Sequence, residues 1–238
     1  IRHIGLSTHN PKVGILAALS GEIEMILFSV NPAFDLLPAS EDMNRYFSPE
    51  YYQEGLSGIH PDRAALYQLC EQKGVGITVM KGYAGGRLFS AGTSPFGVAL
   101  TPVQCIHYAL TRPAVASILA GCDSPAHVLE AVSYETASEE ERDYASTLAG
   151  APLHAYSGQC TYCGHCAPCP KGIDIAMVNK LYDLAMMQPE VPQSIQAHYQ
   201  ALSAGAEDCI ACGSCEKRCP FGVPVIARME KIKALHLR

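Results

Sequence analysis

The chain has 238 residues, of which 48% are hydrophobic and 17% charged; this composition is typical of a folded protein and excludes an intrinsically disordered one. Its formal net charge of −6 provides no general attraction to nucleic acid or to an anionic membrane surface. No apolar run reaches the roughly 18 residues that a membrane helix requires, and the first residues do not have the layout of a signal peptide. We therefore expect neither a nucleic-acid partner nor a membrane.

Up to about residue 135, apolar runs alternate with helical patterns, as they do in repeated strand–helix units. The apolar runs predict strands at 1–6, 22–30, 75–80 and 115–119. Helices are predicted to begin at Pro11, Pro61, Pro102 and Pro125. Strands that are apolar nearly throughout are typical of a parallel sheet that is buried on both faces. We count four strand–helix units, whereas a closed (βα)8 barrel needs eight.

The rest of the chain is predicted to be helical. The segment Ser138–Glu141 has the pattern of a capping box, which begins a helix that should end before Gly150. Helices are expected at 139–148, 175–187 and 193–204, with a linker at 151–158. These boundaries divide the chain into an α/β domain at 1–150 and a small α-helical domain at 151–238.

Eight of the 11 cysteines fall in two short runs near the C-terminus. The first run consists of Cys160, Cys163, Cys166 and Cys169, followed by proline. The second run consists of Cys209, Cys212, Cys215 and Cys219, again followed by proline. A disulfide framework suits a short secreted domain better than a chain of this length. We therefore expect a cytoplasmic protein whose cysteines bind metal.

The second run has the full spacing of bacterial ferredoxins, while the first is one residue shorter before its fourth cysteine. Three thiolates spaced in this way wrap one face of an iron–sulfur cubane, and in two-cluster ferredoxins the fourth cysteine ligates the other cluster. We predict two [4Fe–4S] clusters. One is assigned to Cys160, Cys163, Cys166 and Cys219, and the other to Cys209, Cys212, Cys215 and Cys169. The shorter first run leaves open which cluster Cys169 and Cys219 each complete.

The alternative is a pair of zinc sites with four cysteines each. Zinc knuckles usually place two Cys-x2-Cys pairs on either side of a loop, whereas each run here packs four cysteines into about ten residues before a proline. The pattern therefore favours iron–sulfur clusters. The remaining cysteines are scattered, and Cys70 and Cys105 lie at helix positions that are expected to face the core.

Four stretches carry a family resemblance: Ile1–His9, Ile26–Pro32, Val79–Gly86 and Leu119–Glu130. They are similar to the fifth to eighth strands, and the loops after them, of aldo-keto reductases that carry an appended ferredoxin-type domain. The resemblance implies the C-terminal half of a (βα)8 barrel, or TIM barrel, followed by a ferredoxin-like domain with two clusters. It also implies NADP(H)-linked reduction of a small carbonyl-type substrate, with the clusters as an electron relay.

The resemblance carries over to single residues. Ser7 matches the serine that holds the nicotinamide carboxamide, and the loop at 121–124 matches the one that binds the adenosine phosphate at a helix N-terminus. His127 stands in place of the phosphate-clamping arginine, which weakens the expected preference for NADP(H) over NAD(H) because histidine lacks the bidentate fork. The candidate cofactor-binding residues are Ser7, Gly121, Cys122, Ser124, His127 and Glu130.

No catalytic residue is assigned, because that family takes its catalytic tyrosine, lysine, aspartate and histidine from the first four strands. We expect a single copy to lack a hydride-transfer site unless a second copy in a homodimer, or an N-terminal half from elsewhere, completes the barrel. Two other functions remain open. One is an electron-transfer module that has no hydride chemistry of its own and serves a redox partner protein. The other is a zinc-stapled binding module.

Overall fold

The computed structural model describes residues 2–53, 55–186 and 190–237. It divides the chain into two compact units, Ile1–Ala155 and Tyr156–Arg238, whereas the sequence placed the division after residue 150. Ile1 and Met187, which belong to predicted elements, lie outside the described residues.

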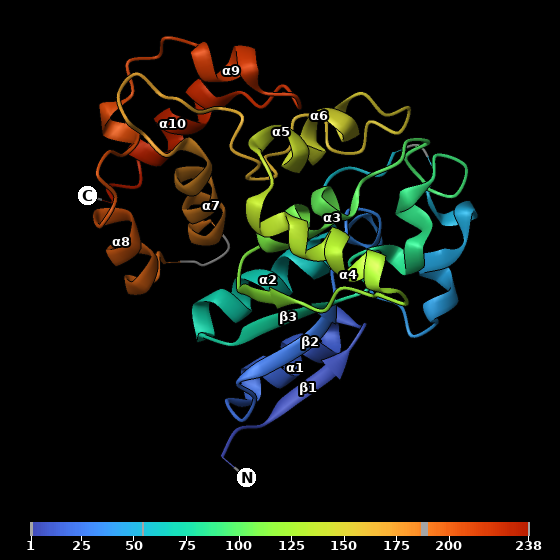
Figure 1. Cartoon of the computed structure of the whole chain (residues 1–238). Coiled ribbons are helices and arrows are strands. Elements are labelled where there is room, and N and C mark those ends of the chain that lie inside the picture. Colours follow the sequence, from blue (N-terminus) through green and yellow to red (C-terminus); the bar gives the residue numbers. More distant parts are fainter. Residues whose placement is uncertain (1, 54, 187–189, 238) are drawn as a thin grey trace. The chain divides into compact units, whose positions relative to one another are not determined.

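The first unit contains a four-stranded parallel sheet whose strands follow the order of the sequence (Figure 1). The strands are β1 (Gly5–Thr8), β2 (Met25–Ser29), β3 (Gly76–Met80) and β4 (Val115–Ile118). The predicted α/β class with a parallel sheet is confirmed. Because the strands run in one direction, their carboxyl ends meet at one edge of the sheet, where the loops after β1 and β4 also begin.

Burial alternates along the two central strands. Phe28 and Val79 are fully buried, whereas Met25 remains 49% exposed and Thr78 is partly exposed. Successive side chains of a strand point to opposite faces, so one face of the sheet enters the core and the other reaches the surface. The prediction of strands buried on both faces is therefore wrong. An apolar run indicates a hydrophobic strand, but it does not indicate which face of the sheet the helices cover.

The four predicted helix starts are confirmed. The helices are α1 (Pro11–Ser20), α2 (Pro61–Lys73), α3 (Pro102–Leu110) and α4 (Pro125–Val132). Each has proline in its first turn, where the missing N–H costs nothing, and each follows a side chain that accepts a backbone N–H. These capping residues are Asn10, His60, Thr101 and Ser124.

The capping box at Ser138 is confirmed, because its Oγ accepts the Glu141 N–H at 3.2 Å and Glu141 Oε2 accepts the Ser138 N–H at 2.7 Å. The single helix predicted after it is wrong. The chain instead forms α5 (Glu139–Arg142) and α6 (Tyr144–Ala149). The break is at Asp143, whose carboxylate accepts the Ser146 N–H at 2.8 Å and so caps a second helix.

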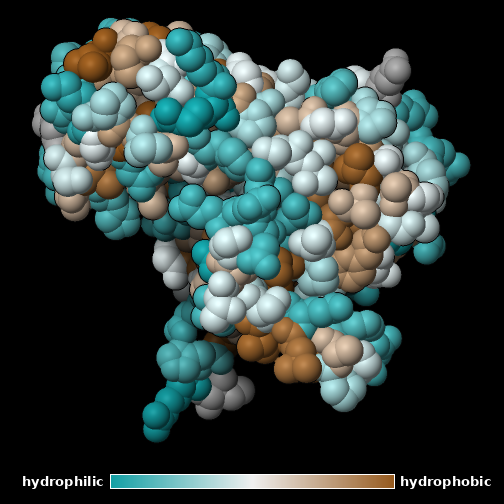
Figure 2. All heavy atoms as spheres, turned by 45° about the horizontal axis from the view of Figure 1, so that its top comes forward, coloured by the Kyte–Doolittle hydropathy of each residue, from teal (hydrophilic) through white to brown (hydrophobic). Residues whose placement is uncertain are grey.

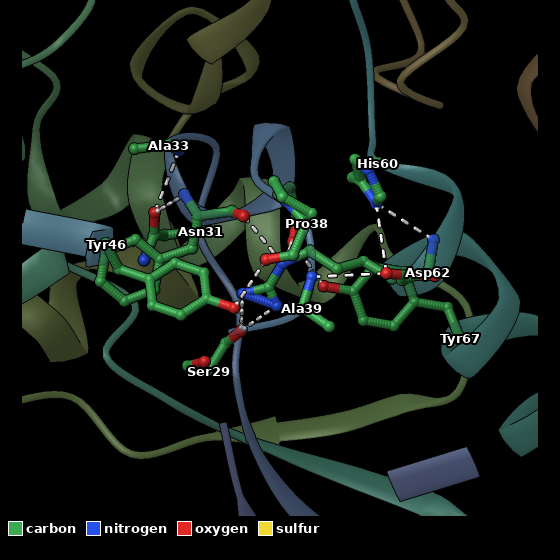
Figure 3. Close-up of polar contacts among 12 residues, drawn as sticks. Ser29, Asn31, Ala33, Pro38, Ala39, Tyr46, His60, Asp62 and Tyr67 are labelled. Atoms are coloured by element: carbon green, nitrogen blue, oxygen red, sulfur yellow. Dashed lines mark hydrogen bonds and ion pairs between the residues drawn. The ribbon is translucent and has the colours of Figure 1, made fainter. Parts of the chain in front are cut away.

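A buried polar network joins the segment after β2 to α2 and α3. Arg63 of α2 donates to the carbonyl of Ser29 at 3.3 and 3.2 Å, and the fully buried Asp35 accepts hydroxyl groups from Tyr67 at 2.6 Å and Tyr108 at 2.7 Å. Figure 3 shows Ser29 and Tyr67 among the residues around this network. Short 3-10 helices complete the unit: η1 (Phe34–Leu36), η2 (Met43–Phe47), η3 (Pro49–Tyr51), η4 (Ala84–Phe89) and η5 (Ser133–Thr136).

The second unit has no strand among its described residues. Its helices are α7 (Ile175–Ala185), α8 (Gln193–Gln200), η6 (Ala206–Asp208), α9 (Ser214–Arg218) and α10 (Val225–Lys233). Its core includes the buried side chains of Val178, Leu181, Tyr199, Met229 and Ile232. The helix predicted to reach residue 204 ends at Gln200, but the helical character of the unit is as predicted.

Apolar side chains reach the surface in several places (Figure 2). Leu16 of α1 is 69% exposed and Leu129 of α4 is 71% exposed, and α4 has no buried residue. Within the described ranges, no helix combines the length and the apolar character needed to cross a membrane.

Candidate metal centre

The structure gathers the eight clustered cysteines around two hollows in the second unit. The Cys209 hollow, of about 390 Å³, is lined by Cys169, Cys209, Cys212 and Cys215. The Cys160 hollow, of about 350 Å³, is lined by Cys160, Cys163, Cys166 and Cys219. Each hollow thus combines three cysteines of one run with the fourth cysteine of the other. Among the described residues, no three or more His, Cys, Asp or Glu side chains are grouped as ligands of one metal ion.

Both runs adopt the same local backbone. The residue before the second cysteine is left-handed in each run, with φ of 58° at Tyr162 and 53° at Ala211. The residue after it is a left-handed glycine, with φ of 87° at Gly164 and 73° at Gly213. Positive φ is uncommon for tyrosine and alanine, so its recurrence shows that the loop geometry requires it. Such turns point successive N–H groups into one concavity and create an anion site of the kind found around iron–sulfur clusters.

A second repeat follows each run, and it escaped prediction from the sequence. Cys169–Ile175 and Cys219–Val225 share the pattern Cys-Pro-x-Gly followed by apolar residues at alternate positions. Gly172 and Gly222 are both left-handed, with φ of 70° and 64°, and the two segments lead into α7 and α10. The recurrence of Cys-Pro-x-Gly, read beyond the last cysteine, is the signal that would have revealed it.

The walls of the two hollows differ in charge. Lys171 and Arg218 line the Cys209 hollow, and no carboxylate does. No Lys, Arg, Asp or Glu is among the residues that line the Cys160 hollow. Arg228 donates to Asn179, a residue of that wall, at 2.6 Å and to Asp183 at 2.5 Å, so this guanidinium is paired with a carboxylate.

Arg218 of α9 joins the second run to the first. Its guanidinium donates to the carbonyl of His165 at 3.3 Å, of Cys166 at 2.6 Å and of Pro168 at 2.8 Å. Because all three carbonyls belong to one turn of the first run, the Arg218 side chain holds that turn beside α9. The side chain lies one position before Cys219, which reaches across to the Cys160 hollow, so it secures the exchange of cysteines between the runs.

Burial raises the pKa of three thiols around the Cys160 hollow, those of Cys160, Cys163 and Cys166. Burial raises the pKa of Cys160 and of Cys166 to about 12, and neighbouring thiols add to the shift at Cys166. At the other hollow, hydrogen bonds from Ser214 lower the pKa of the exposed Cys212. Cysteine binds metal as the thiolate, so positively charged iron is needed to hold four such groups ionised together.

The candidate phosphate-binding residues lie around the N-terminus of α4. Gly121 and Cys122 are exposed in the loop after β4, and Ser124 caps the helix by accepting the His127 N–H at 3.3 Å. The His127 Nδ1 atom lies 2.7 Å from the carboxylate of Asp123. Glu130, on the same helix, is also exposed.

Ser7 lies on the outer strand at the opposite side of the sheet from β4. It is on β1, next to Leu27 of β2, and two strands separate it from β4 and the loop that follows. At about 4.8 Å for each pair of neighbouring strands, Ser7 and that loop are not in contact. The structure therefore brings the loop residues together but leaves Ser7 apart from them. As predicted, Cys70 and Cys105 are fully buried, and burial raises the pKa of each to about 12.

Comparison with known families identifies one part of the chain. Residues 156–224, which include all eight clustered cysteines, match a family described as a 4Fe-4S dicluster domain. No curated protein and no solved structure matches the chain. The second unit therefore resembles a 4Fe-4S dicluster domain, which supports iron–sulfur cluster binding, and nothing in the comparisons supports an aldo-keto reductase part in the first unit.

Proposed function

We propose that the second unit carries electrons one at a time through two [4Fe–4S] clusters. Cys160, Cys163, Cys166 and Cys219 hold one cluster in this proposal, and Cys209, Cys212, Cys215 and Cys169 hold the other. The observation that carries it is the exchange of fourth cysteines between the two hollows, which places four thiols around each. When bound, such clusters supply one-electron redox chemistry.

The chain's own groups fit this role. Backbone N–H groups donate to cysteine sulfurs in both runs, those of Tyr162 and Ser214 to Cys160 and Cys212 respectively. The Val223 N–H donates to the Cys219 sulfur at 3.4 Å. Hydrogen bonds to cluster sulfurs stabilise the added negative charge of the reduced state. Apolar side chains such as Ile173, Val225 and Met229 line the Cys209 hollow and keep water away from much of it. These residues bind and shield the centre.

The test compares two cysteine variants after anaerobic purification. The wild-type chain should contain about eight iron and eight sulfide per chain, two clusters of four, and give a reduced-state EPR signal. Cys212→Ser removes one ligand of one cluster and should lose about half of the iron. Cys122→Ser, which changes an exposed cysteine of the first unit, should keep all of it. A colourless protein, zinc in place of iron, or full iron in Cys212→Ser would contradict the proposal.

We further propose that the first unit is the nucleotide-binding part of an aldo-keto reductase-type enzyme that acts on a small carbonyl-type substrate. Its parallel sheet and the capped N-terminus of α4, where backbone N–H groups favour an anion, support this assignment. The phosphate of NADP(H) or NAD(H) would meet Gly121, Cys122 and Ser124. The carboxylate of Asp123 beside His127 opposes a 2′-phosphate, which favours NAD(H) of the two.

Nucleotide titration tests this second proposal. Ser124→Ala removes the hydroxyl that the proposal places against the phosphate and should weaken NAD(P)H binding by about fivefold, the loss expected for one hydrogen bond of about 1 kcal/mol. Ser133→Ala changes a serine at the opposite end of the same helix and should leave binding unchanged. No binding by the wild type, or equal binding by both variants, would remove the nucleotide assignment. A single copy should show no NAD(P)H oxidation with aldehydes, since it supplies no assigned catalytic residue.

A further inference from the structure

We propose that an acidic redox protein docks on the exposed rim of the Cys209 hollow and exchanges electrons with the group held there. We name this surface the Lys171 face, and it consists of Lys171, Ile210, Ala211, Cys212 and Arg218. The proposal rests on the proposed electron-transfer function of the second unit and adds where the electron crosses the protein surface and which kind of partner receives or delivers it.

The first argument is exposure. Cys212 is exposed, and Ile210, two positions before it, is 57% exposed although both residues line the hollow. At the Cys160 hollow, all four cysteines are only partly exposed, and Thr161 and Asn179 of its wall are buried. Electrons tunnel efficiently only over short distances, so the hollow that has a cysteine at the surface is the exit to a partner. A single exposed isoleucine beside that cysteine supplies an apolar contact point.

The second argument is charge. The exposed Lys171 and Arg218 line the hollow, and no carboxylate lines it. The acidic residues next to Cys209 and Cys215 do not line the hollow, and their carboxylates accept backbone N–H groups. Asp208 accepts from Gly205 at 2.9 Å, and Glu216 accepts from Ile226 at 2.8 Å. The two charged side chains that line the hollow are therefore both basic, in a chain whose net charge is −6, and they attract an acidic partner surface rather than a basic one.

An apolar contact surrounded by basic groups suits a brief encounter, in which charge steers the approach and exposed apolar atoms seat the partner. The transfer itself forms and breaks no bond. A reduced partner would lose one electron and a cluster held at the hollow would gain it, or the reverse. The basic side chains also stabilise the extra negative charge of the reduced centre, so this centre should accept an electron more readily than the one at the Cys160 hollow.

The experiment uses the full chain with both clusters and follows electron transfer by stopped flow from a stoichiometrically reduced acidic flavodoxin. The rate should fall as ionic strength rises from low salt to about 0.1 M, where the Debye length shrinks to about 10 Å. Lys171→Glu should slow the transfer at low salt at least about threefold. Lys231→Glu, the same change on an exposed residue of α10 that lines neither hollow, should have no such effect.

Two further measurements sharpen the test. With a basic cytochrome c as the oxidant of the reduced chain, Lys171→Glu should accelerate the transfer, because the sign of the attraction reverses. Ile210→Ser should slow the flavodoxin reaction while leaving its salt dependence unchanged. Arg218 is left intact because it also holds the first run in place.

The outcomes separate this proposal from the one it rests on. A chain that binds no iron overturns both. A chain with both clusters in which Lys171→Glu and Lys231→Glu react at the same rate with flavodoxin overturns the docking surface alone. A rate that is independent of salt, or chain self-association at low salt that Lys171→Glu abolishes, shows a different occupant and also overturns it.

Discussion

Single residues set how the first unit responds to pH, and His60 is the clearest case. Its imidazole caps α2, with Nδ1 accepting the Asp62 N–H at 3.3 Å, as Figure 3 shows. Burial lowers the pKa of His60 below 6.5, although Asp62 opposes the shift. Burial also lowers the pKa of His9, with Lys81 and Arg63 adding to the effect. The folded unit therefore protonates both imidazoles less readily than the unfolded chain does.

Acidification should destabilise this unit. The unfolded chain binds protons at these histidines below about pH 6.5 more readily than the folded one, so stability is present above that pH and is lost as the pH falls. Replacing His60 by asparagine keeps a capping oxygen but removes the titration, and His60→Asn should flatten the change of melting temperature between about pH 7.5 and 5.5. The exposed His236→Asn should not. An unchanged slope in His60→Asn would contradict the role assigned to this imidazole.

Asp35 shows how much a buried charge depends on its partners. Burial raises the pKa of this carboxyl, while Arg63, whose Nε lies 3.7 Å away, and the hydroxyl groups of two tyrosines act in the opposite direction. Asp35→Asn leaves the Arg63 guanidinium without its compensating charge and should lower the free energy of unfolding by about 3 kcal/mol.

The matched variant at that site is Tyr67→Phe, which removes a single donor and should cost about 1 to 2 kcal/mol. Urea denaturation followed by near-ultraviolet circular dichroism of the tyrosines measures both values. Equal losses in the two variants would show that the carboxylate is not the centre of the network.

At the level of elements, the turn of the first run is held by α9 through one side chain. Arg218→Ala removes three hydrogen bonds to the carbonyls of residues 165, 166 and 168. If these contribute about 1.5 kcal/mol together, iron should be lost to a chelator about tenfold faster. The neighbouring exposed Lys217→Ala should lose iron at the wild-type rate. A fast loss in both variants would indicate a general weakening of α9.

Elements also show where prediction from sequence succeeds. The starts of α1 and α3 follow from a capping side chain and a proline next to each other, which is a strictly local signal. The break at Asp143 was missed because Ser138 and Asp143 are both capping residues, and the sequence between them has neither proline nor glycine to mark the end of a helix. The exposure of one face of the sheet was not predicted, because it depends on which face the helices pack against.

For the whole molecule, iron removal should affect the two units differently. Metal binding to a small domain contributes directly to its folding free energy, and the second unit is small, helical and built around two cysteine-lined hollows. After chelation, limited proteolysis should cut within residues 156–237 while the first unit stays protected. Equal protection of both units before and after chelation would show that the second unit folds without iron.

Some properties of this protein, such as the chemistry of its metal site, are specified by short stretches of the sequence. The spacing of Cys209, Cys212 and Cys215 specifies the chemistry of an iron–sulfur site, because three thiolates on one loop can meet only a compact centre. Other properties depend on contacts between distant segments, such as Cys169 beside Cys209, 40 residues away, or Arg218 beside Cys166, 52 residues away. Only tertiary packing determines these contacts, because the residues next to a side chain in the sequence do not indicate which distant turn will lie against it.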